Sequence, residues 1–359
     1  MSVATDLDKL RILLSHWVEH NRKHSEEFFE WIKRIEGLAS KDVVRHLRSA
    51  GEEMEKVTDH LRAALKHLGG LPKKGQWSMF KRSRRMERSV KISILVENQA
   101  RMSFLDKTFL AQHGLSVFVE ASKRILFDTG ATSIFTHNAK LLGIDLEVTD
   151  VVILSHGHWD HSGGLKSFQP MGPKKLLVAH PQIFADRYRA TGEYIGVGFT
   201  QEEAADRFEL FLTKEPYLLD DDIYFLGEIP RVNDFEGKET KFFYLDGQER
   251  RPDFIIDDSS LAIRTAKGLV IVTGCSHAGI CNILEYAKEV CNEDRIHLVL
   301  GGFHLLDKGE QLEKTIAYFL ENPVDQLYPM HCTGPPALSR LYQAFGIRKL
   351  CAGDVIEIN

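Results

Sequence analysis

Four potential metal ligands stand within six residues of this 359-residue sequence, in the run HGHWDH that starts at His156. Side chains two apart in an extended chain point the same way, so His156 and His158 can bind one cation. Asp160 and His161 follow the turn that Gly157 permits, and they can reach a second cation a few ångströms away. Imidazoles mixed with one carboxylate favour zinc, with iron or manganese as alternatives, over calcium, which prefers oxygen ligands.

Two cations about 3.5–4 Å apart would polarise a phosphoryl or carbonyl oxygen, lower the pKa of a bridging water towards about 7, and hold a leaving group. This chemistry predicts a metal-dependent enzyme acting on a phosphorylated or ester small molecule. The alternatives are a di-iron redox protein and a non-catalytic metal-binding sensor. We favour the enzyme because no flavin-binding segment is visible, and because the run is intact and rich in imidazole.

The run needs a scaffold, and the sequence from about residue 90 onward predicts one. Short β-branched segments separated by Gly and Asp predict strands at Val90–Val96, Leu115–Glu120, Arg124–Phe127, Val151–Leu154, Lys175–Val178, Leu261–Thr265, Leu269–Thr273 and His297–Leu300. Helical patterns lie between them at residues 134–142, 181–189, 280–291 and 309–321. Several predicted strands are almost continuously apolar, which is typical of sheets covered on both faces.

Polar side chains at the ends of these strands are candidates to support the metals or to contact substrate. Asp128 ends one predicted strand and can orient a ligating imidazole through a hydrogen bond. Asp257 and Asp258 precede another strand, where they either orient ligands or form a turn. Glu97 and Asn98 end the first strand of the domain and could supply contacts to substrate.

Two further histidines, His180 and His304, also follow strand-like segments. Each could bind metal or contact substrate. Gly301 and Gly302 precede His304 and would let the backbone come close to a ligand. We therefore name His304, together with Asp160, as the candidate catalytic residues.

Beyond these residues, the sequence resembles a known family. The HGHWDH run is similar to the H-x-H-x-D-H signature of the metallo-β-lactamase superfamily, and residues 125–130 (ILFDTG) resemble its first motif, whose Asp supports the site. The resemblance implies an α+β fold, a four-layer αβ/βα sandwich. It is closest to the branch of 7,8-dihydropterin-6-yl-methyl-4-(β-D-ribofuranosyl)aminobenzene 5'-phosphate synthase-like proteins. The motifs that carry this likeness are ILVEN (94–98), HGLS (113–116), GEIPR (227–231), GCSHAGI (274–280), GGFH (301–304) and HCTG (331–334).

The resemblance also implies further site residues. In the superfamily a metal-bridging Asp follows the strand that corresponds to residues 269–273, whereas here Cys275 stands nearest to that place. We favour His277 as the ligand and leave Cys275 as a thiolate ligand or a small core residue. His331 resembles the His of the last superfamily motif and is assigned to the second metal. In the synthase branch two cations would hold the diphosphate of an activated pterin while an aminobenzene phosphate displaces it, and Arg231 could meet phosphate.

The first 70 residues differ from the rest, because their apolar residues recur only at helical spacing. They predict an N-terminal α-helical hairpin over residues 1–70, with Ser40 as the cap of its second helix. A basic linker follows at residues 71–89 and is either solvated or a patch for phosphate or an acidic partner. The metallo-β-lactamase-like domain spans residues 90–359. A lone hairpin buries little area, so it would pack on this domain or form a homo-oligomer.

The hairpin has a histidine pattern of its own. His16, His20 and His24 fall on one face of the first helix, and His60 is placed on the apolar side of the second. Glu53 is the nearest carboxylate. These residues either form a regulatory metal or haem site or only flank the apolar contact.

Bulk composition narrows the classes of partner. The formal net charge of −5 argues against nucleic acid. The five cysteines all lie in the last quarter of the sequence and no secretory leader is visible, which predicts a reduced, cytoplasmic protein. No apolar run approaches the roughly 20 residues needed to span a bilayer, so we expect no membrane partner.

Overall fold

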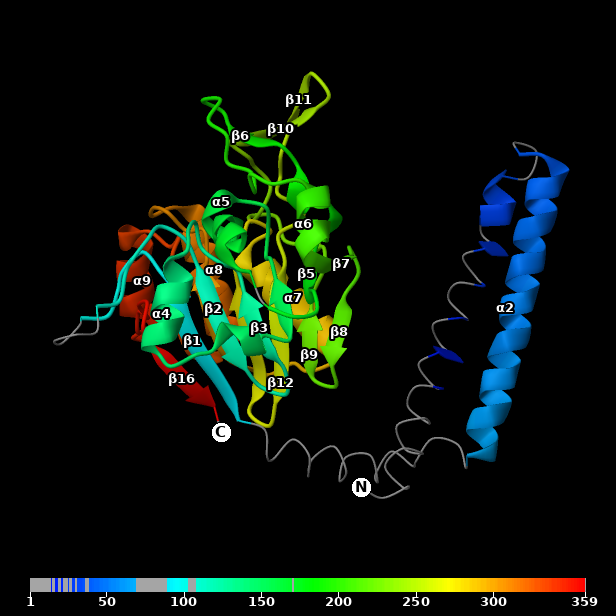
Figure 1. Cartoon of the computed structure of the whole chain (residues 1–359), viewed down its shortest axis with the longest axis horizontal. Helices are drawn as coiled ribbons and strands as arrows, with labels where there is room; N and C mark the ends of the chain where they lie inside the picture. Colours follow the sequence, from blue (N-terminus) through cyan, green and yellow to red (C-terminus); the bar gives the residue numbers. More distant parts are fainter. Residues whose placement is uncertain are drawn as a thin grey trace. The chain divides into compact units, whose positions relative to one another are not determined.

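The computed structural model describes residues 14, 17–18, 21, 25, 28–29, 31–35, 39–68, 89–102, 108–169 and 171–358. The chain divides into two compact units, Met1–Arg84 and Arg85–Asn359, each coloured by position along the chain in Figure 1. Among the described residues, no helix combines the length and apolar character needed to cross a membrane.

In the first unit the described residues between 14 and 35 are helical, and α2 spans Lys41–His67. Ser40 caps α2 by accepting a hydrogen bond from the Val43 N–H at 3.4 Å. The two helical segments meet at Gly51, whose carbonyl accepts a hydrogen bond from Ser25 Oγ at 3.4 Å. A Cβ on Gly51 would lie 3.1 Å from the Phe29 ring, so the glycine allows this close approach.

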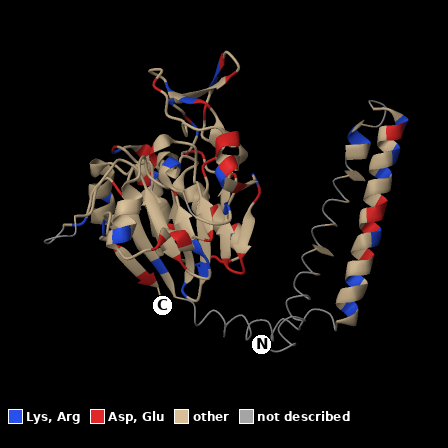
Figure 2. Cartoon of the chain, viewed as in Figure 1, with Lys and Arg blue, Asp and Glu red and all other residues tan. Residues whose placement is uncertain are grey.

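The predicted histidine site of the hairpin is not supported where the structure describes it. His16, His20 and His24 lie outside the described residues, as does the predicted linker over residues 71–89 apart from its last residue. His60 and Glu53 are exposed, whereas Gly51 and Thr58 form the buried face of α2. Since His60 follows Thr58 by two residues, it points about 200° away from that face, and its placement on the apolar side was wrong. Figure 2 shows basic and acidic residues interspersed along α2. Oligomerisation through this unit stays a prediction.

The second unit contains two large sheets among the described residues. The first has the strand order β16 (Val355–Ile358), β1 (Val90–Val96), β2 (Ser116–Glu120), β3 (Arg124–Phe127), β4 (Val151–Ile153), β5 (Lys175–Ala179) and β7 (Phe208–Leu212). The second has the order β15 (Val324–Met330), β14 (Ile296–Gly302), β13 (Gly268–Thr273), β12 (Ser260–Thr265), β9 (Ile223–Phe225) and β8 (Tyr217–Asp220). Strands β3, β4, β5 and β7 run parallel, and so do β13, β14 and β15.

The sheets pack face to face between two outer layers of helices. Strand β13 contributes to both sides of its sheet. Val270 and Val272 pack in a hydrophobic cluster with residues of the other sheet. Leu269 and Ile271 pack in a second hydrophobic cluster with the helices on the outer face. This alternation follows from the two-residue period of a strand. The helices on that side are α7 (Ile280–Cys291), α8 (Glu310–Glu321) and α9 (Pro335–Phe345). A third cluster packs the first sheet against α4 (Ile134–Leu141). The predicted four-layer α+β sandwich is therefore confirmed.

The predicted strands are confirmed to within two residues at each end, and α7 has the predicted bounds. The helix predicted at residues 181–189 was wrong. A single 3-10 turn, η3 (Pro181–Phe184), is followed by strand β6 (Arg187–Arg189). Strand β6 pairs with β10 (Phe242–Asp246), which also pairs with β11 (Glu249–Pro252). Burial of the Arg187 side chain and pairing with β10 override the local helical pattern. Figure 1 shows this small sheet at the end of the domain where α5 (Trp159–Ser162) lies.

An ion pair between Arg124 and Asp150 fastens the start of β3 to the residue before β4. The Arg124 Nε and Nη2 donate to the two Asp150 oxygens at 3.0 and 2.9 Å. Hydrogen bonds from Arg124 lower the pKa of Asp150 below its usual 3.8. The stabilisation is therefore present above pH 3.8 and is lost as the pH falls through the lowered pKa.

We expect Asp150→Asn to reduce the free energy of unfolding at neutral pH by about 1 kcal/mol or less, since both side chains are partly exposed. Urea unfolding of both proteins over a pH series measures the effect. The two curves should converge below the lowered pKa. A gap of constant size at every pH would contradict the ionic origin of the effect.

Candidate metal centre

The site lies where loops from both sheets meet, beyond the carboxyl ends of parallel strands. The HGHWDH run follows β4, and Asp128 directly follows β3. In the facing sheet, Cys275 and His277 follow β13, and His331 directly follows β15. Parallel strands place their carboxyl ends at the same edge of a sheet, so residues distant in sequence converge here.

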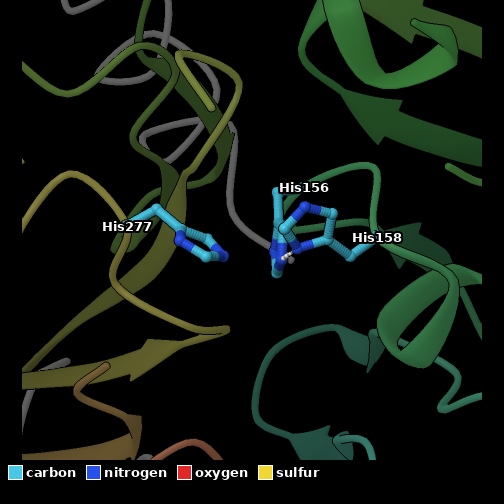
Figure 3. A group of neighbouring side chains, drawn as sticks. All are labelled: His156, His158 and His277. Atoms are coloured by element: carbon cyan, nitrogen blue, oxygen red, sulfur yellow. Dashed lines mark hydrogen bonds between the residues drawn. The ribbon is translucent and has the colours of Figure 1, made fainter. Parts of the chain in front are cut away.

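The first group of donors consists of His156, His158 and His277, whose donor atoms all lie within 4.8 Å of one another. Figure 3 shows His277 pointing from the second sheet towards the other two side chains. His156 Nε2 lies 2.9 Å from His158 Nδ1. The buried Nε2 atoms of His158 and His277 have no hydrogen-bond partner. A buried nitrogen without a partner is costly, and a cation bound by these imidazoles would account for both.

Burial lowers the pKa of all three of these imidazoles well below the usual 6.5. They are neutral at neutral pH. A neutral imidazole binds a divalent cation without first losing a proton. The electrostatics of the first group therefore fit metal binding.

The second group consists of Asp160, His161, His331 and Cys275. His161 Nε2 lies 3.1 Å from His331 Nε2, 3.2 Å from Cys275 Sγ and 4.0 Å from Asp160 Oδ2. His331 Nε2 lies 3.3 Å from Asp160 Oδ2. Donors at zinc bond lengths of about 2.0–2.3 Å in a tetrahedron would be about 3.3–3.8 Å apart. The observed separations come close to this range, so a cation of zinc size fits.

Charge in the second group also favours a cation. Although burial opposes it, Asp128 and Asp160 raise the pKa of His161 to about 9. Burial similarly opposes ionisation of Asp160, but His161 and hydrogen bonds from His113 and His331 lower the pKa of that carboxyl well below its usual value. The carboxylates therefore stabilise positive charge at the position where the second group of donors converges.

Asp128 holds His161 in place, as the sequence predicted for a supporting residue. Its Oδ2 lies 2.7 Å from His161 Nδ1 and accepts a hydrogen bond from Ser155 Oγ at 2.7 Å. Its Oδ1 accepts one from the Ser155 N–H at 2.7 Å. With Nδ1 occupied in this way, His161 Nε2 is left to face the other donors.

Glu97 and Asn98 both contact His331, and substrate binding by Asn98 stays a prediction. Glu97 is fully buried, and its Oε1 accepts a hydrogen bond from the His331 N–H at 3.0 Å. Asn98 Oδ1 lies 3.0 Å from His331 Nδ1, and its Nδ2 donates to the His331 carbonyl at 2.9 Å. The prediction of substrate contacts is therefore corrected for Glu97, because both its oxygens are engaged within the protein.

Asp257 positions the turn between the first two histidines. Its Oδ2 accepts a hydrogen bond from the Gly157 N–H at 2.8 Å, and its Oδ1 accepts one from Arg187 Nη2 at 2.6 Å. A Cβ on Gly157 would lie 2.3 Å from the Ile183 carbonyl, so this turn requires glycine. Neighbouring Asp258 accepts a hydrogen bond from the Ala278 N–H at 2.9 Å, beside His277. Both acids orient loops that carry ligand candidates.

The remaining predicted residues are less closely connected to these groups. The His304 ring lies 4.3 Å from the His277 ring, at the rim of the first group. His180 is buried, and both of its ring nitrogens have partners within the protein. Its Nε2 lies 3.2 Å from Glu228 Oε2, and its Nδ1 accepts a hydrogen bond from the Gln182 N–H. Arg231 Nη2 donates to the carbonyls of residues 254 and 255, so this guanidinium holds a loop. Phosphate binding by Arg231 stays a prediction.

Three site residues were missed by the sequence analysis. His113 is half exposed, and its Nε2 lies 3.2 Å from Asp160 Oδ2. Cys332 shares a cluster with Cys275 and His331. The Phe242 ring lies 5.3 Å from the His158 ring. The HGLS and HCTG motifs contained signals for the first two, whereas nothing in the sequence around Phe242 marked it.

Backbone strain is concentrated at this site. Six non-glycine residues have positive φ in the described part of the chain, and four of them lie here. These are Asp128 (φ 55°), Ser276 (60°), His304 (48°) and His331 (46°). Each such conformation costs about 1–3 kcal/mol and persists only where surrounding contacts hold it. The network around these residues thus imposes the geometry of the donors.

Comparison with known proteins agrees with this geometry. Residues 111–275 match the family described as the metallo-beta-lactamase superfamily, and residues 10–68 match a domain of unknown function, DUF8180. An uncharacterized protein of Methanocaldococcus jannaschii is 38% identical over 255 residues, which is 70% of this chain and 94% of that protein. The 7,8-dihydropterin-6-methyl-4-(beta-D-ribofuranosyl)-aminobenzene-5'-phosphate synthase of the same organism is 34% identical over 288 residues, 75% of this chain and 97% of that protein.

A solved structure supports the same assignment. Tm1679, described as a metal-dependent hydrolase of the beta-lactamase superfamily, matches with a TM-score of 0.66 and 32% identity. The match covers 75% of this chain and 99% of that one. With this fold, these relatives and the arrangement of the HGHWDH run, the chain belongs to the metallo-β-lactamase superfamily.

Proposed function

We propose that this chain is a two-metal enzyme that joins a pterin to a ribofuranosylaminobenzene phosphate, as the name of its Methanocaldococcus relative states for that protein. The observation that carries the proposal is the pair of donor groups that both sheets contribute. The first is His156, His158 and His277, and the second contains Asp160, His161, His331 and Cys275. Zinc is the expected cation, with iron or manganese as alternatives.

When bound, two such cations polarise a phosphoryl oxygen and stabilise a departing diphosphate. The chain's own residues would orient the reactants around them. His304 lies at the rim of the first group, where it can contact substrate. The exposed His113 shares a hydrogen bond with Asp160 through its Nε2 and can hold a proton there. The Phe242 ring covers the first group and would exclude water from one side.

Hydrolysis of a phosphorylated or ester small molecule is the second candidate. It is favoured by the likeness to Tm1679, whose description names a metal-dependent hydrolase. The same donor groups serve either reaction, because both require a polarised oxygen and a stabilised leaving group. The nucleophile separates them, being an aromatic amine in one case and water in the other.

Two assays on one preparation distinguish the reactions. The protein is stripped with a chelator, reloaded separately with zinc, manganese or iron, and given either bis(p-nitrophenyl) phosphate or a dihydropterin methyl diphosphate with the aminobenzene phosphate. Formation of the joined pterin product, dependent on reloaded metal, supports the synthase. Release of nitrophenol alone supports the hydrolase. A protein that binds metal but turns over neither would favour the sensor alternative, and redox cycling of a di-iron form would favour the redox alternative.

A further inference from the structure

Two cysteines from non-adjacent strands meet beside the second donor group. Cys275 follows β13 and Cys332 follows β15, and β14 lies between these strands in the sheet. Their sulfurs lie within 4.8 Å of each other and of the His331 donor nitrogen. Cys332 Sγ also donates to the Cys275 carbonyl at 3.4 Å. Both thiols are free.

A glycine on the intervening strand makes this approach possible. A Cβ on Gly302 would lie 2.4 Å from Cys332 Sγ and 3.3 Å from the Cys275 Cα. The φ of Gly302 is one that other residues adopt readily, since it is not among the positive values. The glycine is therefore needed for the space it leaves between the two cysteines, and not for a turn.

The two thiols differ in access. Cys275 is buried at 4% exposure, whereas Cys332 is only partly buried. Within the described residues, no metal-type cluster contains Cys281, Cys291 or Cys351. An accessible thiol next to a second, sheltered thiol is the arrangement in which oxidation ends in a disulfide.

We propose that Cys275 and Cys332 form a reversible disulfide when the second metal position is empty, and that this bond prevents metal binding there. The inference rests on the proposed two-metal site, because it assigns a regulatory modification to one of its ligand candidates. The oxidant is a two-electron thiol oxidant such as diamide. Its N=N bond accepts two electrons and two protons from the two thiols and becomes a hydrazine, while one S–S bond forms between the sulfurs.

The consequence follows from the place of Cys275. Its Sγ lies 3.2 Å from His161 Nε2, within the second donor group. A disulfide sulfur cannot serve as a thiolate ligand, so that group loses its sulfur donor. A cation bound there would in turn engage Cys275 and protect it from oxidation. Metal occupancy and oxidation therefore exclude each other.

The test uses the full chain, freed of metal with a chelator and then treated with diamide. Peptide mapping without reductant should recover a Cys275–Cys332 cross-link, and the intact mass should fall by two hydrogens. Subsequent zinc binding should fall by about half and return after treatment with dithiothreitol. Protein loaded with zinc before diamide should give little cross-link.

Matched variants make the result decisive. Cys332→Ser should give no cross-link, and diamide should leave its zinc capacity equal to that of the same variant before treatment, whereas Cys291→Ser should behave as the unmodified protein does. Absence of the cross-link from metal-free protein with both thiols titratable would overturn the inference. Equal loss of zinc capacity in Cys332→Ser would overturn it as well. Failure of the two-metal site itself would appear in the untreated arm as absence of a second zinc, while the cross-link is scored independently of metal.

Discussion

The His158→Ala variant is expected to lose about half of its bound metal and to turn over substrate at a rate lower by about a thousandfold or more. His158 belongs to the first donor group, and its Nε2 is a buried nitrogen without a hydrogen-bond partner. Removing the ring takes away one of three imidazoles, and the remaining two cannot hold a cation firmly. Metal analysis and the two assays described above measure both effects.

His137→Ala is the matched control, because His137 is an exposed histidine on α4 whose Nε2 lies 3.0 Å from the Thr108 carbonyl oxygen, and it belongs to neither donor group. Its metal content and turnover should equal those of the unmodified protein. Circular dichroism of both variants shows whether the fold is retained. Full activity in a metal-poor His158→Ala protein would refute the proposed role of the first group.

The largest effect on stability is expected from Arg187→Met. The Arg187 side chain is fully buried, and its guanidinium pairs with Asp257 at 2.6 Å and Asp253 at 3.2 Å. Methionine is of similar length but removes the positive charge beside these two buried carboxylates, which keep only hydrogen bonds from the Gly157 and Ile255 N–H groups among those described. Breaking a buried ion pair from one side costs about 3–5 kcal/mol. Urea unfolding at neutral pH should show a loss of this size in the free energy of unfolding.

Arg124→Met provides the same chemical change at a partly exposed ion pair, with Asp150 as the partner. The expected loss in the free energy of unfolding is much smaller than in Arg187→Met, because water screens that pair. The loss of stability in Arg187→Lys should lie between those of the two methionine variants. Lysine keeps the positive charge but lacks the planar guanidinium group that can donate several hydrogen bonds at once. If Arg187→Met and Arg124→Met lost equal amounts of unfolding free energy, burial of Arg187 would not explain the strength of its ion pairs. Metal content should also fall in Arg187→Met, because Asp257 holds the Gly157 turn.

Much of the fold could be predicted from the sequence because the signals are local. An almost continuously apolar segment of five or six residues is enough to predict a buried strand, as Leu269–Thr273 did for β13. The same holds for the HGHWDH run, whose donors are neighbours in the chain. The helix prediction at residues 181–189 failed because the conformation there is set by contacts distant in the sequence. There the conformation depends on pairing with β10 and on carboxylates about 70 residues away.

By itself, the sequence determined the superfamily, the layered α+β fold and the two histidines that begin the metal run, because each follows from residue types at short spacing. Only the tertiary structure decided what the other residues do. Glu97 and Asn98 became supports of His331 across more than 230 positions. Cys275 and Cys332 became neighbours across 57 positions. Such contacts are set by the order of strands in a sheet, and strand order depends on packing of the whole domain, which no local pattern encodes.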